Sequence, residues 1–286
     1  MKRTVTEVPK SVIGDPRKAR MSVNMNEVVG DSDILFVCLD TLRYDVAKEE
    51  EIQGNTPSIN RYARWEKRHA PGNYTFPSHM AMFIGNLPSP AEPVPLYERE
   101  RLFVAKENQA LGRLHPYSFV FEGDSFIRGL ERAGYTTACV GGVGFFNKRT
   151  PINNILPSFF MESYWNTRFA CHIKESFENQ INFIETWLKK RREGERVFLY
   201  LNVDSIHYPN SFYMEGEKED SIKTHAAALR YVDAHIERLF SLFRQRNKTF
   251  CILCSDHGTC YGEEGYYFHC LSHGIVYTVP YMHFFL

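Results

Sequence analysis

The sequence has no long apolar run and no net charge, and each absence excludes a class of protein. No stretch approaches the ~20 apolar residues that a transmembrane helix needs, and the N-terminal residues lack the apolar centre of a signal peptide. Lysine and arginine together number 34, as do aspartate and glutamate. Nothing in the charge therefore favours a nucleic-acid or membrane partner, and any anion must bind to a local feature.

The cysteines do not form a disulfide framework either. Their number, seven, is odd, and they are scattered along the chain, which is typical of reduced thiols. We therefore expect a cytoplasmic protein. Cys251 and Cys254 form a C-x-x-C pair within the apolar run "TFCILCSD", and we interpret them as packing residues of a strand rather than a redox pair.

Four apolar runs predict the sheet. They are "DILFVCLD", "YTTACVGG", "RVFLYLNVD" and "TFCILCSD", and continuous apolar runs of this length are typical of strands buried on both faces. Helical apolar stripes precede the last two runs, one from about residue 175 to 191 and one over residues 229–243. Alternating strands and helices predict a three-layer α/β/α sandwich with a mostly parallel central sheet.

The chain divides into a short extension and one domain. Residues 1–30 are polar and without period, so we expect a poorly ordered N-terminal extension. Residues 31–286 are predicted to form a single α/β domain. Within it, residues 86–117 are rich in proline and charge and are predicted to form an irregular excursion over the surface.

Polar side chains follow three of the predicted strands. Asp40 follows the first run, Asp204 and His207 follow the third, and Asp256 and His257 follow the fourth. Because the carboxyl ends of parallel strands share one edge of the sheet, we expect these side chains to meet there. Each aspartate taken singly suits a helix cap equally well. Together they would repel one another without a cation, so the sequence predicts a divalent metal ion.

These segments also carry a family resemblance. The order "LDTLRYD", "YTFPSH", "GYTTACVGG", "LNVDSIHYP", "SDHGTCYGEEG" and "SHGIVYTVPY" resembles the sulfatase-like branch of the alkaline phosphatase superfamily, from about residue 26 to the C-terminus. More narrowly, it resembles a bacterial group of small sulfatase-like, metal-dependent hydrolases. The resemblance implies an alkaline phosphatase-like fold and an enzyme that acts on phosphate or sulfate esters.

The resemblance also implies roles for individual residues. Asp40 matches the first metal-binding carboxylate of the family, and Asp256 with His257 match the later metal pair. Thr75 in "YTFPSH" matches the nucleophile, which also binds the metal. Metal coordination lowers the pKa of such a hydroxyl, and a helix N-terminus adds N–H groups aimed at an anion. The alternative is a plain capped helix in which Thr75 or Ser78 is the cap.

Departures from the family pattern limit these implications. True sulfatases have two adjacent aspartates where this chain has Asp40 and Thr41, and the cysteine that is modified to their nucleophile is absent. Sulfate chemistry is therefore disfavoured. Asp204, His207 and His273 are the candidates for a second metal site, while His207 alternatively contacts the substrate oxyanion. The sequence leaves one metal or two open.

Further residues are candidates for contact with the nucleophile or the substrate. His79 could hydrogen-bond either of them. Asn147 and Lys148, after "GYTTACVGGVGFF", could bind the substrate or belong to a glycine-rich turn. Arg43 could bind phosphate or pair with Asp45.

One more group of potential metal ligands lies near the C-terminus. His269 lies near Cys260 and Cys270, but their spacing fits no familiar zinc pattern. We therefore interpret these three residues as packing.

The sequence thus predicts a metal-dependent hydrolase of phosphate mono- or diesters with a phosphothreonine intermediate. One or two divalent ions are expected, with manganese and zinc favoured and magnesium and calcium compatible. The partner would be a small-molecule phosphate or sulfate ester. A sulfatase, a phospho-group transferase, or a non-catalytic binding protein that retained the fold are the alternatives.

Overall fold

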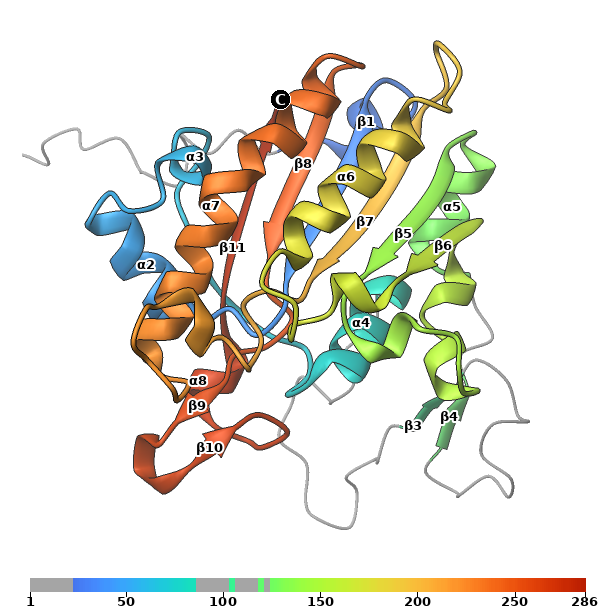
Figure 1. Cartoon of the computed structure of the whole chain (residues 1–286). Coiled ribbons are helices and arrows are strands. Elements are labelled where there is room, and N and C mark those ends of the chain that lie inside the picture. Colours follow the sequence, from blue (N-terminus) through green and yellow to red (C-terminus); the bar gives the residue numbers. More distant parts are fainter. Residues whose placement is uncertain (1–22, 86–102, 106–117, 121–123) are drawn as a thin grey trace, which may run out of the picture.

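A seven-stranded sheet forms the centre of the computed structural model, which describes residues 23–85, 103–105, 118–120 and 124–286. The strand order is β2-β11-β8-β1-β7-β5-β6 (Figure 1). The strands of this sheet are β1 (Asp33–Leu39), β2 (Glu66–His69), β5 (Thr136–Gly141), β6 (Glu162–Trp165), β7 (Val197–Val203), β8 (Thr249–Cys254) and β11 (Thr278–Phe285). Two small two-stranded sheets pair β3 (Phe103–Ala105) with β4 (Ser118–Val120) and β9 (Cys260–Tyr261) with β10 (Tyr267–Phe268).

Helices connect the strands. They are α1 (Met25–Val28), α2 (Tyr44–Ile52), α3 (Pro57–Asn60), α4 (Thr75–Ile84), α5 (Phe126–Arg132), α6 (Ser176–Leu188), α7 (Ile222–Arg244) and α8 (Gly274–Tyr277). Short 3-10 turns include η3 (Gly144–Phe146), η6 (Thr167–Phe169) and η8 (Glu263–Gly265).

The predicted mostly parallel sheet is confirmed. β1 pairs in parallel with β7 and β8, and β5 pairs in parallel with β7 and β6. The four apolar runs correspond to β1, β5, β7 and β8. Three strands were not predicted: the antiparallel β11, the charged edge strand β2 and the half-buried β6. β2 reads "EKRH" and lacks the apolar run that identified the central strands.

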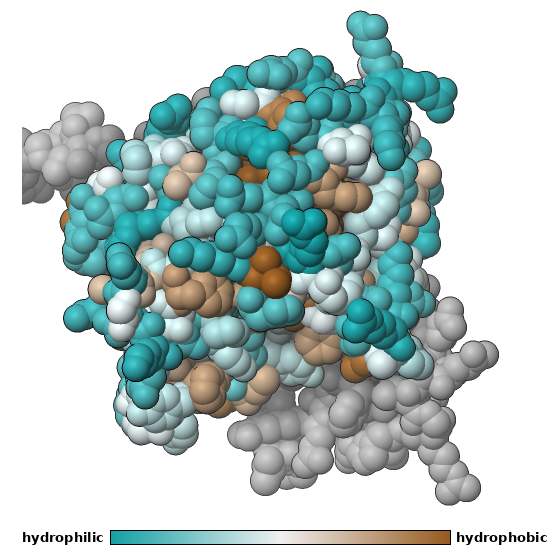
Figure 2. Space-filling view, in the orientation of Figure 1, coloured by the Kyte–Doolittle hydropathy of each residue, from teal (hydrophilic) through white to brown (hydrophobic). Residues whose placement is uncertain are grey.

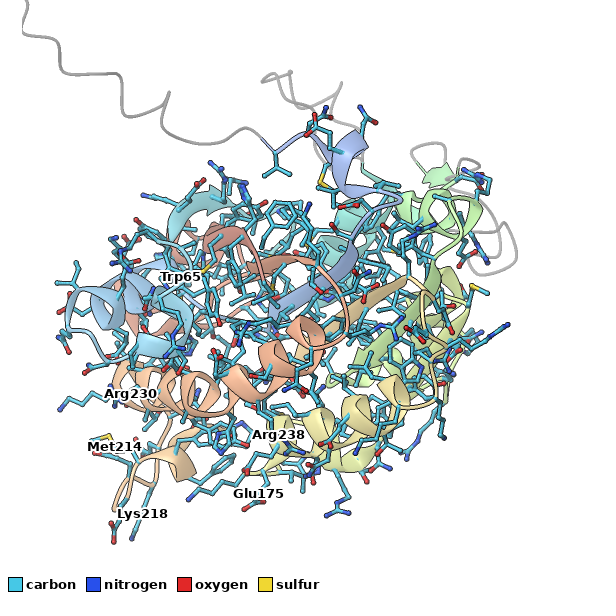
Figure 3. The ribbon with its side chains drawn as sticks, turned by 90° about the horizontal axis from the view of Figure 1, so that it is seen from above. Trp65, Glu175, Met214, Lys218, Arg230 and Arg238 are labelled. Atoms are coloured by element: carbon cyan, nitrogen blue, oxygen red, sulfur yellow. The ribbon has the colours of Figure 1, made fainter. Side chains whose placement is uncertain are left out.

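Helices cover both faces of the sheet. Alternate residues of the central strands point to opposite sides, so each face has apolar side chains for helices to pack against. Leu35, Val37 and Leu39 of β1 share one apolar cluster with residues of α6 and α7. Ile34 and Cys38 of the same strand share the other cluster with residues of α4 and α5. Seen from above, α6 and α7 lie together on one side of the strands, with Arg230 and Arg238 labelled on α7 (Figure 3).

The two predicted helical stripes are buried as expected. Phe177, Ile181 and Ile184 of α6 and Leu229, Val232 and Ile236 of α7 are fully buried against the sheet. The outer surface of this helical face is largely hydrophilic (Figure 2). No helix among the described residues combines the length and apolar character needed to cross a bilayer.

Part of the predicted N-terminal extension is ordered. Residues 1–22 lie outside the described residues, as does most of the predicted 86–117 excursion. Residues 23–30, however, include α1, whose N-cap Asn24 accepts a hydrogen bond from the backbone N–H of Asn26. Val28 is buried, and the N–H of Gly30 donates to the hydroxyl of Tyr135 at 3.0 Å. Tertiary packing thus orders a segment whose composition alone did not indicate structure.

Candidate functional site

Polar side chains converge at the carboxyl edge of the parallel strands, the lower edge of the sheet in Figure 1. Asp40 follows β1 directly, and Asp256 and His257 follow β8. One potential ligand atom from each of these three side chains lies within 4.8 Å of the others, and all three residues are fully buried. The predicted meeting of these segments is therefore observed.

Thr75 belongs to this group. It is the first residue of α4, and the N-cap is Tyr74, which makes no side-chain capping hydrogen bond. The hydroxyl Oγ1 of Thr75 instead lies 3.4 Å from Oδ2 of Asp40 and 3.4 Å from Nε2 of His257. Because its hydroxyl is turned toward the carboxylate and the imidazole, the helix-cap alternative for Thr75 does not describe this structure.

A strained turn and a neighbouring amide position the two carboxylates. Thr41 has φ +63, a left-handed conformation that is unfavourable for a β-branched residue. In it, the N–H of Thr41 donates to Oδ1 of Asp256 at 3.3 Å. On the other side, Nδ2 of Asn202 donates to Oδ2 of Asp40 at 3.0 Å, while its Oδ1 accepts from the backbone N–H groups of Gly142 and Val143. Sequence reasoning did not identify Asn202.

The imidazole of His257 presents an unprotonated nitrogen to the site. Its Nδ1 lies 2.9 Å from the carbonyl oxygen of Gly258, so Nδ1 carries the proton and donates it. Burial lowers the pKa of His257, so the ring is neutral and Nε2 keeps its lone pair. That Nε2 lies 3.5 Å from Oδ2 of Asp256 and 3.7 Å from Oδ1 of Asp40.

The donor set fits a divalent cation. Oδ1 of Asp40 and Oδ2 of Asp256 are buried and accept no hydrogen bond from the residues described. A buried carboxylate oxygen without a partner is costly, and burial raises the pKa of Asp256, with the nearby Asp40 adding to the shift. A cation between the two carboxylates, the imidazole and the hydroxyl would remove this cost, and these are ligands that manganese and zinc both accept.

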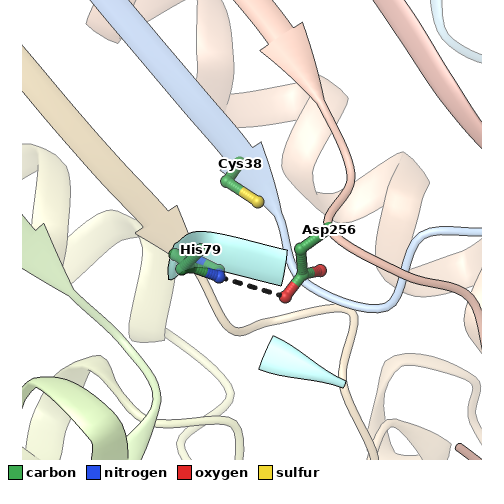
Figure 4. Close-up of side chains that lie close together, drawn as sticks. All are labelled: Cys38, His79 and Asp256. Atoms are coloured by element: carbon green, nitrogen blue, oxygen red, sulfur yellow. Dashed lines mark ion pairs between the residues drawn. The ribbon is translucent and has the colours of Figure 1, made fainter. Parts of the chain in front are cut away.

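His79 lies behind this group, inside the core. Its Nδ1 is 2.7 Å from the carbonyl oxygen of Thr75 and 3.6 Å from Oδ2 of Asp256 (Figure 4). Burial lowers the pKa of His79 to about 4. The structure therefore gives His79 contact with the backbone of Thr75 rather than with its hydroxyl, and the fully buried ring has no access to a substrate. It is a positioning residue.

His269 lies at the site, although we interpreted it from the sequence as a packing residue. Its ring centroid is 4.5 Å from that of His257 and 5.3 Å from that of His207. The hairpin β9–β10 carries it there, and the backbone N–H of Cys270 donates to the carbonyl of Asn73 at 2.8 Å. No spacing motif could have indicated this contact, because it depends on how the hairpin folds back.

The candidates for a second metal site are only partly brought together. Asp204 and His207 lie with Cys171, one ligand atom of each within 4.8 Å of the others. Burial raises the pKa of Asp204 to about 6. His273 instead caps α8, with Nδ1 accepting from the N–H of Ile275 at 3.2 Å and Nε2 3.6 Å from Glu264. Its predicted metal role has no support from these contacts.

The guanidinium of Arg43 is occupied within the protein. It donates to Asp45, Glu263 and the carbonyl of Thr259, so the pairing alternative describes it and phosphate binding does not. Asn147 accepts from Arg149 and Asn153 through Oδ1, and these contacts serve the turn.

Lys148 is likewise engaged away from the site. Its Nζ is exposed and donates to the carbonyl of Ser163 at 2.7 Å. The turn after β5 thus accounts for the contacts of Asn147 and Lys148, as the glycine-rich-turn alternative proposed.

A separate cavity of about 890 Å³ lies on one face of the sheet. Apolar residues of β1, β8, α1 and α5 line most of it, and it contains none of the site residues named above. The candidate chemistry is therefore not located in this cavity.

The fold and this convergent site define a protein of the sulfatase-like branch of the alkaline phosphatase superfamily. The chain belongs to the sulfatase family, whose model matches residues 32–284. A search of curated proteins finds no match.

Several solved structures have the same fold. The C-terminal periplasmic domain of phosphoethanolamine transferase EptC from Campylobacter jejuni is 15% identical with a TM-score of 0.60, over 89% of this chain and 79% of that one. The soluble domain of lipooligosaccharide phosphoethanolamine transferase A from Neisseria meningitidis gives the same identity and TM-score, over 89% and 76%. The lipoteichoic acid synthase LtaP from Listeria monocytogenes is 12% identical with a TM-score of 0.56, over 89% and 65%.

Proposed function

We propose that the protein is a metal-dependent enzyme that takes a phospho group from a phosphate ester onto Thr75 and passes it to an acceptor alcohol. The observation that carries this proposal is the position of the Thr75 hydroxyl, 3.4 Å from Asp40 and from His257. Buried carboxylate oxygens of Asp40 and Asp256 face the same point without hydrogen-bond donors from the described residues.

Four residues would hold the metal ion: Asp40, Thr75, Asp256 and His257. A divalent ion bound there supplies the charge that lowers the pKa of the threonine hydroxyl and neutralises the developing oxyanion. Manganese and zinc remain the favoured ions. One of the similar folds, the periplasmic domain of EptC from Escherichia coli, was solved in complex with zinc.

The remaining steps use groups of the chain itself. In the first displacement the Thr75 hydroxyl loses its proton, the bond from Oγ1 to phosphorus forms, and the bond from phosphorus to the leaving oxygen breaks, that oxygen taking up a proton from solvent. In the second, the acceptor alcohol loses its proton, its oxygen bonds to phosphorus, and the bond from phosphorus to Oγ1 breaks, so that Thr75 regains its hydroxyl. The backbone N–H groups of Thr75 and Phe76 begin α4, where N–H groups lack intrahelical acceptors, and they would donate to a non-bridging oxygen of the substrate. The imidazole ring of His269 lies 4.5 Å from that of His257 and 5.3 Å from that of His207, and we assign His269 and His207 to contact with the substrate.

The acceptor decides between transfer and hydrolysis. Three of the similar structures are named as phosphoethanolamine transferases, which favours an alcohol as the acceptor of the phospho group. The rings of Tyr208 and Phe268 lie 4.8 Å apart, tilted by 51°, and Tyr208 also lies against His269. These aromatic rings would contact the organic part of a donor or acceptor. Where no alcohol is present, water takes its place and the phosphothreonine is hydrolysed.

The test measures release of p-nitrophenol from its phosphate monoester, phosphate diester and sulfate, each with manganese or zinc, with and without added alcohols. We expect the phosphate esters to be favoured, and an alcohol to divert part of the product from free phosphate to a new ester. Intact-protein mass spectrometry after rapid acid quench should show one added phosphate.

Two substitutions at one position control this test. Thr75→Val keeps the shape of the side chain but removes the nucleophile, and we expect a loss of about 10³-fold or more in kcat/KM. Thr75→Ser keeps a hydroxyl and should retain part of the activity and the phosphorylated species. Undiminished turnover by Thr75→Val would exclude the proposed nucleophile.

The cytoplasmic location and a small-molecule ester as the partner remain predictions. All seven cysteines are free in the structure, which agrees with a reducing compartment. The similar EptC structures are periplasmic domains by their names, so localisation of the tagged full chain by fractionation is the direct measurement.

A further inference from the structure

A second group of potential ligands lies beside the candidate active site, and it contains a thiol. Asp204 follows β7, His207 lies three residues further along the same turn, and Cys171 follows η6. One ligand atom from each lies within 4.8 Å of the others. The Asp204 and His207 pair was expected from the sequence, but Cys171 was not among the candidates.

We propose that Cys171, Asp204 and His207 form a second metal site whose thiolate makes it selective for zinc over manganese. Its capacity to bind an ion is independent of the proposed function. Its part in turnover, as the ion that holds the substrate oxyanion, rests on that proposed function.

Asp204 is the strongest indication of a ligand. The side chain is 2% exposed. Its Oδ2 accepts the backbone N–H of Cys171 at 2.8 Å, and Oδ1 accepts no hydrogen bond from the described residues. An unsatisfied carboxylate oxygen at this depth is unfavourable unless something else binds it.

The backbone that carries this carboxylate is closely packed. A Cβ on Gly142 would lie 2.5 Å from Cβ of Asp204 and 3.0 Å from the carbonyl oxygen of Asn202, so the end of β5 packs directly on the aspartate. Only glycine permits this approach. The packing and the Cys171 N–H together fix where the free oxygen points.

His207 presents the right nitrogen. Its Nδ1 lies 2.5 Å from the carbonyl oxygen of Tyr208 and therefore carries the proton. This leaves Nε2 with a lone pair, which is how histidines that bind metals are usually oriented by a carbonyl partner. The ligand atoms of the three side chains lie within 4.8 Å of one another. Ligands bound at roughly 2.0–2.3 Å around a tetrahedral zinc ion lie about 3.3–3.8 Å apart, so a small side-chain rotation would bring these atoms to ligand spacing.

The thiol decides which ion the site prefers. Cys171 offers its thiol sulfur as the ligand atom, and metal binding would release the thiol proton. Thiolate, imidazole and carboxylate together suit zinc or cobalt, whereas manganese and magnesium prefer oxygen ligands. The first site has no thiol among Asp40, Thr75, Asp256 and His257, so the two sites should differ in selectivity.

Cobalt substitution tests the thiol ligand directly, because a thiolate bound to Co²⁺ gives a charge-transfer band in the near ultraviolet. We expect this band in the full-length chain after chelator treatment and addition of Co²⁺. Cys171→Ser should abolish it and weaken zinc binding by about tenfold or more. After dialysis against excess Mn²⁺, the wild-type chain should keep zinc and the variant should not.

Two other cysteines serve as controls. Cys38 is near His79 and Asp256 in the buried cluster of Figure 4, and Cys270 is exposed. Cys38→Ser and Cys270→Ser should both keep the band. A band that persists in Cys171→Ser, that disappears in Cys38→Ser, or that is absent from the wild-type chain overturns the proposal.

Further variants separate this proposal from the proposed function. Asp204→Asn removes a second ligand of the site and should also lose the band, with thermal unfolding used to verify that both variants fold. Asp256→Asn should abolish turnover and leave the band. A missing band with intact Thr75-dependent turnover defeats the second site alone, and a normal band with Thr75-independent turnover defeats the proposed function alone.

Discussion

Arg43 and Asp40 lie three residues apart in the same turn. The hydrogen-bonding capacity of the Arg43 guanidinium is filled within the protein, whereas that of the Asp40 and Asp256 carboxylates is not. Arg43 has its donors occupied by Asp45, Glu263 and the carbonyl of Thr259. Asp40 and Asp256 each keep one carboxylate oxygen that accepts no hydrogen bond from the described residues. One group is complete within the protein, and the other needs a charge from outside.

Whether a buried charged group has all its hydrogen bonds made separates structural from functional charges more clearly than burial does. Arg43 is 2% exposed, and Asp40 and Asp256 are 0% exposed, so depth does not distinguish them. Their hydrogen-bond partners do distinguish them, because an ion pair whose hydrogen bonds are all made does not need a ligand. From the sequence, both groups were candidates for phosphate chemistry. The structure distinguishes them by the number of their polar atoms that have hydrogen-bond partners.

Among the variants that compare these two groups, the largest effect is expected from Asp256→Asn. The asparagine keeps an oxygen for the N–H groups of Thr41 and His257, which now donate to Oδ1, but it removes the charge that would bind the metal. We expect loss of the first metal ion and at least about 10²-fold lower kcat/KM. The metal content per chain and kcat/KM measure the two expected losses, and thermal unfolding verifies that the variant folds. Full metal content in the variant would mean that Asp256 is not a ligand.

Arg43→Met should affect stability rather than catalysis. It leaves Asp45 and Glu263 without their shared cation, and because both carboxylates are partly exposed, we expect a loss of about 2–3 kcal/mol in the free energy of unfolding. Urea unfolding measures it. Arg238→Met, which removes an exposed pair with Glu185, is the matched control and should cost about 0.5 kcal/mol or less.

The kinetics of the same variant decide between the two interpretations of Arg43. Unchanged KM for the phosphate ester and unchanged metal content are the expected results. A tenfold rise in KM with normal stability would instead restore Arg43 as a phosphate ligand.

Asn202→Ala should have an intermediate effect on the incomplete group. The amide donates to Oδ2 of Asp40 and accepts two backbone N–H groups from the turn after β5. Its removal frees the Asp40 carboxylate to rotate, so we expect about tenfold weaker metal binding. Titration with Mn²⁺ measures this. Affinity equal to that of wild type would show that packing alone holds Asp40.

A further effect concerns pH and the complete group. Nε2 of His225 accepts the backbone N–H of Arg43 at 3.3 Å, and burial, with the Arg43 charge adding to it, lowers the pKa of His225 to about 3. Below about pH 6.5 His225 binds a proton in the unfolded chain but not in the folded chain, so the free energy of unfolding falls as the pH falls toward 3. The contribution is about 1.4 kcal/mol per pH unit.

A variant isolates this contribution from the other titrating groups. His225→Gln keeps a hydrogen-bond acceptor but cannot titrate. Between pH 6.5 and 5, wild type should lose about 2 kcal/mol more than the variant in urea unfolding. Equal losses in the two proteins would show that His225 is already protonated in the folded state.

The sequence predicted the central strands, the meeting of Asp40, Asp256 and His257, and the place of Thr75 beside them. These succeeded because buried parallel strands have a strong apolar signal and because topology brings their ends to one edge. Asn202 was missed because it lies inside β7, where it reads only as a polar interruption of a strand.

Other residues of the site depend on tertiary contacts that leave no local pattern. His269 reaches the site through the β9–β10 hairpin, and Cys171 follows a single 3-10 turn with no periodicity. For Arg43 the sequence left phosphate binding and pairing with Asp45 open, because nothing in "LDTLRYD" indicated that Glu263, 220 positions away, would also pair with it.

The hydrogen bond from the N–H of Cys270 to the carbonyl of Asn73 constrains the route by which a substrate enters. It joins the hairpin that carries His269 to the loop that leads into Thr75. Outward movement of the hairpin would have to break this hydrogen bond, which favours entry of a substrate with the hairpin in place.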